Sequence, residues 1–374
     1  MKKVLFVNSI LWPGGVEKTL LNITNQLAKD NNYEITILTI YEDKRYKEYI
    51  NDKIKYKYIF KNLQLDGIRK NIYTKIQHEI LMRGCYFINK YFIGSKYDIV
   101  VGFAEGFPTK IVSYTKGAKK IAWIHTDFKE FRWSYNHYKN EEEEKKAYEA
   151  VDKIVCVSNV SKEHFLQFYN YREKTYLIYN LLDEANILNL ASEKCDDIKY
   201  EKDRKYITYI GRFAAIKKVD RLIEAFSLLI REMNDTTLVL IGDGILKDNI
   251  KNQVNSLKLN DKVLFLGLQD NPYKYLKNST ILVSSSDSEC APVTICESLL
   301  LGIPVVTTNC SGSVEMVGNG KFGTIVEKNS LSLYKGLKSI LENDSIYNNY
   351  KKEIEKRNRY MTSQRIIGQL KDIL

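Results

Sequence analysis

The stretch VLFVNSILWPGGVEKTLLNITNQLAKDNNYEITILTI, residues 4–40, decides the fold class of this chain. It starts with a short apolar run, VLFVNS, which is typical of a buried strand. The segment VEKTLLNITNQLA (residues 16–28) is typical of a helix, and YEITILTI (residues 33–40) is again typical of a strand. A strand, a helix and a second strand in succession predict a parallel sheet wrapped by helices.

The same alternation continues over most of the 374 residues. It is lost between residues 183 and 204, and a second series begins with KYITYIGRF at residue 205. We therefore expect an α/β protein with two doubly wound, Rossmann-like domains that face each other across a deep interdomain cleft. The predicted domains cover residues 1–185 and 186–350, followed by a C-terminal helix over 351–374 that packs back on the N-terminal domain.

The composition argues against an integral membrane protein and favours a reducing compartment. No apolar run approaches the ~20 residues that are needed to span a bilayer. The apolar run in MKKVLFVNS is too short for a signal peptide, so we interpret it as a first strand. The six cysteines are scattered without a CxxC pair, so we expect free thiols, no zinc site and a cytoplasmic location.

The net charge of +11 is compatible with three classes of anionic partner: nucleic acid, a membrane surface or a small substrate. The chain is also rich in Lys, Asn, Ile and Tyr throughout, so part of the excess can reflect composition alone. Only local clusters of charge therefore count as evidence for a partner.

Two stretches at predicted strand ends could contact phosphate groups. WPGGVEKT (residues 12–19) places Gly15 between the first strand and a helix, where the backbone can approach a ligand and free N–H groups can face an anion. In GRFAAIKK (residues 211–218), Arg212 follows a strand and Lys217 comes just before the next helix. These two cations could hold a diphosphate, or could simply be surface charges.

The stretch ECAPVTICE, residues 289–297, contains two glutamates. Glu289 is predicted in a loop after a strand, and Glu297 in a helix whose first turn contains Pro292. The pair could clamp sugar or ribose hydroxyls, act as general acid and base, or be surface charges. A metal site is less favoured because no DxD sequence occurs in the chain.

Of the four histidines, only His125 is a good functional candidate. It ends the apolar run IAWIH, at the position where ligands bind in open α/β sheets.

Taken in order, these motifs resemble the retaining glycosyltransferases of family 4, which have the GT-B fold. The matching features are Gly-Gly after the first strand, His125, the Arg212 and Lys217 block with LIEAF, LIGDG, and the two glutamates followed by LGIPVV.

The resemblance implies that Arg212 and Lys217 bind the diphosphate of a nucleotide-sugar donor and that Gly15 closes over it. It further implies that Glu297 binds the ribose, that His125 lies near the transferred sugar and that Leu268 lies near the base. Glu289 and the backbone amides would contact the donor sugar and its phosphate, the amides coming from Ala291, Pro292, Val293 and Thr294.

The resemblance also implies a reaction. The expected enzyme is a hexosyltransferase that displaces the leaving group on the front face of the sugar, with no protein nucleophile, no cofactor and no metal. The expected donor is a UDP-sugar, and the expected acceptor is a glycan linked to a polyprenyl diphosphate in the synthesis of bacterial capsule, O-antigen or exopolysaccharide. The chain departs from the family at Cys290-Ala291, where Gly-Phe is common, and at Lys218, where Gly is frequent. These departures concern the identity of the donor.

A basic helix is predicted between residues 68 and 92. Ile68, Ile72, Ile76 and Ile80 have helical spacing, and Phe87 and Tyr91 follow. Basic residues occur among them: Arg69, Lys70, Lys75, Arg83 and Lys90. This stripe could pack on its own sheet, or it could rest peripherally on the inner face of an anionic membrane.

Two other functions compete with the transferase. A sugar-nucleotide epimerase of the same fold would need a second set of acid and base groups, which is not evident beside His125 and the glutamates. A basic nucleic-acid-binding protein is suggested by the charge alone, but no recognisable nucleic-acid module is present.

Overall fold

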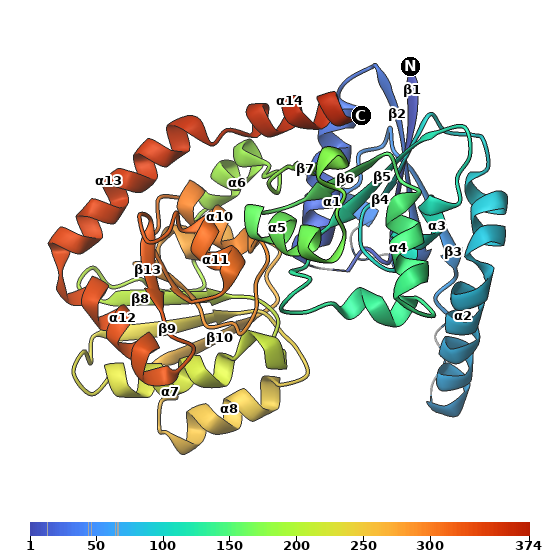
Figure 1. Ribbon diagram of the computed structural model, residues 1–374. Coiled ribbons are helices and arrows are strands. Elements are labelled where there is room, and N and C mark those ends of the chain that lie inside the picture. Colours follow the sequence, from blue (N-terminus) through green and yellow to red (C-terminus); the bar gives the residue numbers. More distant parts are fainter. Residues whose placement is uncertain (13, 44, 46, 64, 66) are drawn as a thin grey trace. The chain divides into compact units, whose positions relative to one another are not determined.

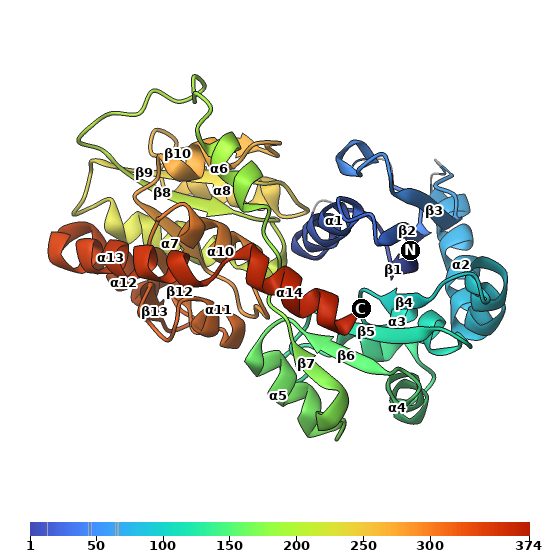
Figure 2. The same ribbon diagram turned by 90° about the horizontal axis from the view of Figure 1, so that it is seen from above.

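The computed structural model describes residues 1–12, 14–43, 45, 47–63, 65 and 67–374 (Figures 1 and 2). The chain divides into two compact units: unit 1 contains Met1–Leu181 and Ile366–Leu374, and unit 2 contains Leu182–Arg365. Each unit is built on one parallel sheet with helices on both faces, so the prediction of two doubly wound α/β domains is confirmed.

The sheet of unit 1 has seven strands in the order β3-β2-β1-β4-β5-β6-β7, all paired in parallel. Chain order reverses between β1 and β4, which is the point where open α/β sheets bind ligands. The strand bounds are β1 Lys2–Asn8, β2 Tyr33–Tyr41, β3 Lys55–Phe60, β4 Ile99–Gly102, β5 Lys119–Ile124, β6 Lys153–Cys156 and β7 Thr175–Leu177.

Helices cover both faces of this sheet. Val4 to Val7 in β1 are at most 1% exposed, which explains their continuous apolar run in place of an alternating one. On one face, Leu5 and Val7 pack with residues of α2 and α3. The helices of unit 1 before its C-terminal segment are α1 Gly15–Ala28, α2 Gly67–Ile88, α3 Phe107–Ser113, α4 Glu141–Glu149 and α5 Asn159–Phe168.

The sheet of unit 2 has six strands in the order β10-β9-β8-β11-β12-β13. Ile207 and Tyr209 of β8 point into the core beneath α7, whereas Tyr206 packs on the opposite face with Val239 and Tyr275. Chain order reverses between β8 and β11, so a second switch point lies there. The strand bounds are β8 Lys205–Ile210, β9 Thr236–Ile241, β10 Val263–Gly267, β11 Ile281–Ser284, β12 Val305–Thr308 and β13 Gly323–Val326.

The helices that accompany this sheet are α6 Glu184–Ala191, α7 Val219–Leu229, α8 Lys247–Ser256, α9 Tyr273–Lys277, α10 Val293–Leu300, α11 Ser311–Met316, α12 Ser330–Glu342 and α13 Asp344–Tyr360. The last helix, α14 (Ser363–Ile373), begins in unit 2 and ends in unit 1. Its end is held there because Lys153 Nζ donates hydrogen bonds to the carbonyl oxygens of Asp372 and Ile373. Within the described ranges, no helix combines the length and apolar character needed to cross a membrane.

Candidate active site

In unit 2, the loop after β8 carries Arg212 and leads to Lys217. Lys217 ends a short 3-10 helix, η5 (Ala215–Lys217), just before α7. The Arg212 side chain is exposed, while the Tyr209 hydroxyl donates a hydrogen bond to the Arg212 carbonyl oxygen at 3.0 Å and fixes the backbone. Phe213 N donates to the carbonyl oxygen of Asp243 at 2.9 Å, so this loop is tied to the one after β9.

Close packing of backbone at this edge depends on glycine. Gly211 N donates to Ile241 O at 3.0 Å, and Gly242 N donates to Gly267 O at 2.7 Å. Gly242 has a φ of +140°, and a Cβ atom there would lie 1.9 Å from the carbonyl oxygen of Gly211. No other residue fits at this position. From the sequence, Gly242 is predicted only as a member of the LIGDG motif, with no role of its own.

The structure brings together two of the predicted site residues, Lys217 and Glu289. Lys217 Nζ lies 2.6 Å from Glu289 Oε1, and the Ser286 hydroxyl donates to the same oxygen at 2.6 Å. Both charged side chains are partly buried. They form an ion pair at the carboxyl ends of the neighbouring strands β8 and β11.

The loop that carries Glu289 is fixed to η5 and α7. Asp287 N donates to Ile216 O, and the Ser285 hydroxyl donates to Lys217 O, each at 2.9 Å. Arg221 of α7 donates to the carbonyl oxygen of Ser285 at 2.9 Å and to Asp287 Oδ1 at 2.6 Å. Sequence analysis missed Arg221, because its spacing within a helix gives no sign of this distant partner.

The same loop is also held from the side of α11. Gly312 N donates to the carbonyl oxygen of Glu289 at 3.0 Å. A Cβ atom at Gly312 would lie 1.9 Å from the carbonyl oxygen of Cys290, so the contact requires glycine. The backbone around Glu289 is therefore immobilised on two sides, while its carboxylate remains partly exposed.

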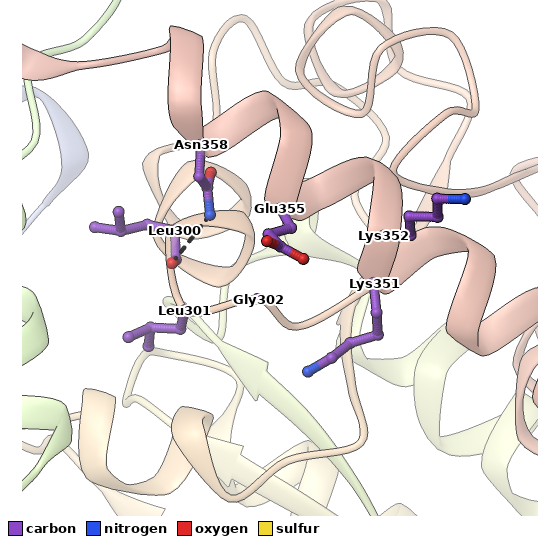
Figure 3. Close-up of a pocket in the computed structure, with 7 residues that line it drawn as sticks. All are labelled: Leu300, Leu301, Gly302, Lys351, Lys352, Glu355 and Asn358. Atoms are coloured by element: carbon purple, nitrogen blue, oxygen red, sulfur yellow. Dashed lines mark hydrogen bonds between the residues drawn. The ribbon is translucent and has the colours of Figure 1, made fainter.

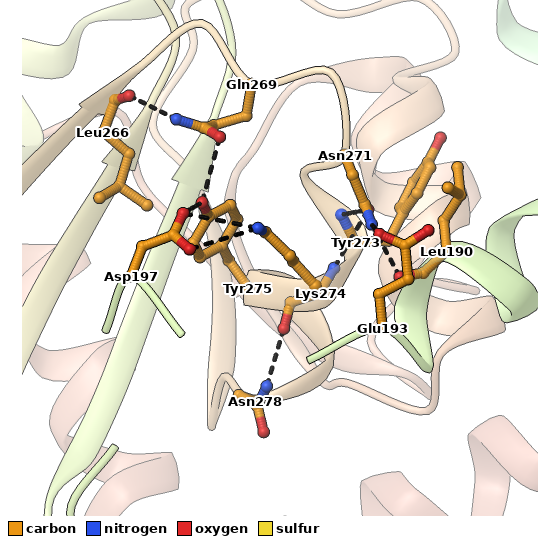
Figure 4. A network of polar contacts seen from close by, with 10 residues as sticks. All are labelled: Leu190, Glu193, Asp197, Leu266, Gln269, Asn271, Tyr273, Lys274, Tyr275 and Asn278. Atoms are coloured by element: carbon orange, nitrogen blue, oxygen red, sulfur yellow. Dashed lines mark hydrogen bonds and ion pairs between the residues drawn. The ribbon is translucent and has the colours of Figure 1, made fainter. Parts of the chain in front are cut away.

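Glu297 has different surroundings from Glu289. It lies in α10, is 1% exposed, and accepts a hydrogen bond from the Tyr273 hydroxyl at 2.9 Å. Tyr273 opens α9, and Asn271 Oδ1 accepts from the backbone N–H groups of Tyr273 and Lys274 at 3.1 and 3.3 Å (Figure 4). These hydrogen bonds from Asn271 hold the start of the helix that carries Tyr273, the residue that orients Glu297.

The remaining predicted residues of unit 2 lie at the same edge of the sheet. Pro292 immediately precedes α10 and has no N–H group to offer to a phosphate. The neighbouring backbone N–H groups near the helix start belong to Ala291, Val293 and Thr294. Leu268 follows β10 and is 68% exposed, directly after Gly267 with its φ of +69°.

In unit 1, the buried carboxylate of Glu105 holds His125 in position. Glu105 was not among the residues predicted from the sequence. Glu105 follows β4 and is 1% exposed. Its Oε1 accepts from the backbone N–H of His125 at 2.6 Å and from both the N–H and the hydroxyl of Thr126, at 2.7 and 2.9 Å. Burial raises the pKa of the Glu105 carboxyl, and these hydrogen bonds oppose that shift only in part.

The imidazole of His125 is buried between aromatic rings. It lies 4.9 Å from the ring of Phe103 and 6.4 Å from that of Trp123, measured between centroids. Burial lowers the pKa of His125 to about 3, against the opposing hydrogen bond to the backbone of Phe103. Nε2 has no hydrogen-bond partner among the described residues. The ring is therefore neutral at pH 7, with one nitrogen available for a substrate hydroxyl.

Gly15 is the first residue of α1 and is exposed. Gly14 precedes it in extended conformation and accepts a hydrogen bond from Lys18 N at 3.0 Å. Pro13, in the predicted turn, lies outside the described residues. Gly15 and His125 thus follow β1 and β5, at the carboxyl edge of the sheet of unit 1.

A surface hollow of about 440 Å³ lies elsewhere on unit 2 (Figure 3). It is lined by the C-terminal end of α10 and by α13, with Asn358 donating to the carbonyl oxygens of Leu299 and Leu300. A helix that follows a parallel strand ends at the amino edge of the sheet, so this hollow is at the opposite edge from Glu289. Across the described part of the chain, no group of three or more His, Cys, Asp or Glu residues could hold a metal ion.

Comparison with known proteins gives two family matches. Residues 13–186 match Glycosyltransferase Family 4, and residues 192–357 match Glycosyl transferases group 1. A Campylobacter jejuni N-acetylgalactosamine-N,N'-diacetylbacillosaminyl-diphospho-undecaprenol 4-alpha-N-acetylgalactosaminyltransferase is 35% identical, over 56% of this chain and 56% of that protein. This chain therefore matches little more than half of that relative's length.

Two other comparisons cover nearly the whole chain. An uncharacterized glycosyltransferase of Haemophilus influenzae is 25% identical over 93% of this chain and 92% of that protein. The crystal structure of Anabaena Alr3699/HepE in complex with UDP-glucose superposes with a TM-score of 0.77 at 17% identity, covering 100% of this chain and 99% of that one. Together with the two parallel sheets, this likeness confirms the fold class.

Proposed function

Because this chain belongs to the family 4 glycosyltransferases and has the GT-B fold, we propose that it is a retaining hexosyltransferase with a UDP-sugar donor. The relatives support a glycosyltransferase in general terms. The choice of donor is supported by the UDP-glucose complex of the Anabaena protein.

The observation that carries the proposal is the Lys217–Glu289 ion pair at the carboxyl edge of the sheet of unit 2. A partly exposed ammonium group can exchange its carboxylate partner for a diphosphate, which offers more charge and more acceptors. Arg212 follows the same strand as Lys217, β8, and is exposed, so two cations are available for the same leaving group. Stabilising that leaving group needs no metal ion in this proposal.

The other residues receive roles from their surroundings. Glu297, held by Tyr273, binds the ribose hydroxyls, and Glu289 binds the donor sugar once Lys217 turns to the diphosphate. The amides of Ala291, Val293 and Thr294 face the phosphate, and the backbone at Leu268 contacts the base. In unit 1, we assign Gly15 to the phosphates and the neutral His125 to a hydroxyl of the transferred sugar. His125 is thus a binding group and not a general acid at neutral pH.

The proposed acceptor is a glycan on a polyprenyl diphosphate, used to build a bacterial surface polysaccharide. The Campylobacter relative supports this class, because its name specifies a diphospho-undecaprenol acceptor. A lipid-linked acceptor would be met at a membrane, so peripheral contact with the inner face of the cell membrane is part of the proposal.

The function is tested with UDP-, GDP- and ADP-sugars in the presence of EDTA. We expect a UDP-sugar to stabilise the protein, by about 2.7 kcal/mol at a ligand concentration of 100 Kd, and to be hydrolysed slowly to UDP. Glu289→Ala should abolish this hydrolysis, whereas Glu355→Ala, in the hollow of Figure 3, should not. Epimerised nucleotide sugar as the product, or stabilisation by none of the sugars, would overturn the assignment.

A further inference from the structure

Helix α2 and the π-helix η2 (Asn89–Ile93) that follows it carry a row of large apolar side chains on the protein surface. Their exposed fractions range from 43% for Ile80 to 77% for Tyr91. In Figures 1 and 2, α2 lies at the outer edge of unit 1. The row consists of Ile72, Ile76, Ile80, Tyr86, Phe87 and Tyr91.

This row is not the face by which α2 packs on its sheet. That face is formed by Leu81, Cys85 and Ile88, which are buried in the core with strand residues of unit 1. At 100° per residue, Ile76 and Ile80 point well away from this buried face, so α2 has apolar residues on two sides. The possibility that the predicted stripe packs on its own sheet is therefore wrong for Ile72, Ile76 and Ile80. The side chain of Ile68 lies outside the described part of the chain.

The surroundings of the row are basic. Residues 67–93 contain five Lys or Arg residues and one acidic residue, Glu79. Glu79 is already in an exposed ion pair with Arg83 at 3.1 Å. The five basic residues are exposed: Arg69, Lys70, Lys75, Arg83 and Lys90.

We propose that α2 and η2 form a docking surface for an anionic phospholipid bilayer. The 22 residues of α2 extend for about 33 Å, enough to lie along a membrane surface. The apolar row enters the boundary between headgroups and acyl chains, where the rings of Phe87 and Tyr91 are favourable, and the cations bind headgroup phosphates.

The charge distinguishes this occupant from a second copy of the chain. Joining two copies through this face would bring two sets of like charges together, which is unfavourable at an interface. An anionic lipid surface instead offers opposite charge to the cations and an apolar layer to the row. The surface thus fits a bilayer better than it fits itself.

The test is sedimentation with vesicles of phosphatidylcholine, either alone or mixed with an equal amount of phosphatidylglycerol. We expect the protein to sediment with the mixed vesicles only. Lys70→Glu, Lys75→Glu and Lys90→Glu together should weaken this binding by at least about tenfold. The apolar variant Ile72→Ser, Ile76→Ser, Phe87→Ser should lose it as well, with little change in thermal stability because these side chains are exposed. A matched charge control is Lys202→Glu, Lys335→Glu and Lys352→Glu, exposed residues of unit 2.

Three outcomes would overturn the proposal. The first is that the unmodified protein does not bind anionic vesicles. The second is that the lysine variant of unit 2 loses as much vesicle binding as the lysine variant of α2 and η2. The third is that the unmodified protein is a dimer in solution and the apolar variant is a monomer. Binding is measured without a sugar donor, so its failure is distinct from failure of the proposed transferase activity.

Discussion

Unit 1 and unit 2 place their candidate residues at equivalent edges of their sheets but in different environments. In unit 1, His125 is 9% exposed and neutral, and a buried glutamate holds its backbone. In unit 2, Lys217 and Glu289 are charged, partly exposed and paired with each other. The backbone beneath that pair is fixed by Gly242 and Gly312, which no larger residue could replace.

This difference indicates that the two units contribute differently to the site: unit 1 a fixed group, and unit 2 an ion pair that can open. A buried, neutral group contributes a fixed position, because moving it would leave polar atoms unpaired. A partly exposed ion pair contributes only about 0–1 kcal/mol to stability, so opening it costs little. Unit 2 can therefore release Lys217 to an incoming diphosphate while its loops stay in place.

The largest expected effect follows from removing the positive charge of Lys217 in unit 2. Lys217→Ala should lower kcat/KM for sugar transfer by about 10²–10³-fold, since it removes one cation that stabilises the leaving group. The melting temperature should change little, because the ion pair is partly exposed. The control is Lys338→Ala, which removes a lysine of α12 that pairs with Glu232 and should leave transfer unchanged. A wild-type rate for Lys217→Ala would remove Lys217 from the site.

The second largest effect is expected at Glu105, the buried carboxylate of unit 1. Glu105→Ala leaves the N–H groups of His125 and Thr126 without their acceptor. Each buried donor left unpaired costs about 1–3 kcal/mol, so the free energy of unfolding should fall measurably in a denaturant titration. Glu105→Gln retains an oxygen acceptor and should recover most of that loss. Glu142→Ala is an exposed control in the same unit, and a similar loss there would argue against a specific role for Glu105.

The order of strands and helices could be predicted from the sequence because each element has its own local pattern. The positions of His125, Lys217 and Glu289 after strands could be predicted one by one, since each follows its own apolar run. The Lys217–Glu289 pairing could not, because 72 residues separate its members and only the sheet order makes their strands neighbours. Glu105 gave no local signal, as its partners are backbone groups after another strand.

The buried face of α2 is a second feature that the spacing of apolar residues does not predict. Apolar residues recur at helical spacing on two sides of this helix, so spacing alone does not reveal which side packs on the sheet. Leu81, Cys85 and Ile88 take the buried positions, and the isoleucines that define the more regular pattern remain exposed. Only the position of the helix beside the sheet distinguishes the two faces.

The smallest expected effect is a pH dependence of the free energy of unfolding that comes from the buried His125 of unit 1. The pKa of His125 is about 3 in the folded protein, compared with an ordinary value of 6.5. Between these values the unfolded state binds a proton that the folded state does not, so the free energy of unfolding falls as the pH decreases from 6.5. At 1.36 kcal/mol per pKa unit, the loss at pH 5 is about 2 kcal/mol.

The effect of His125 can be separated from that of Glu105 by comparing pH profiles of unfolding. The raised pKa of Glu105 acts in the opposite direction, because its folded carboxyl retains a proton to higher pH than the unfolded one. His125→Gln should reduce the loss between pH 6.5 and 5 whatever its effect on absolute stability at pH 7, and the part that remains comes from His137, because burial lowers its pKa as well. His78→Gln removes an exposed histidine from α2 and should leave the wild-type profile intact. If His125→Gln kept the wild-type slope, His125 would titrate alike in both states, and its role as a buried neutral group would be refuted.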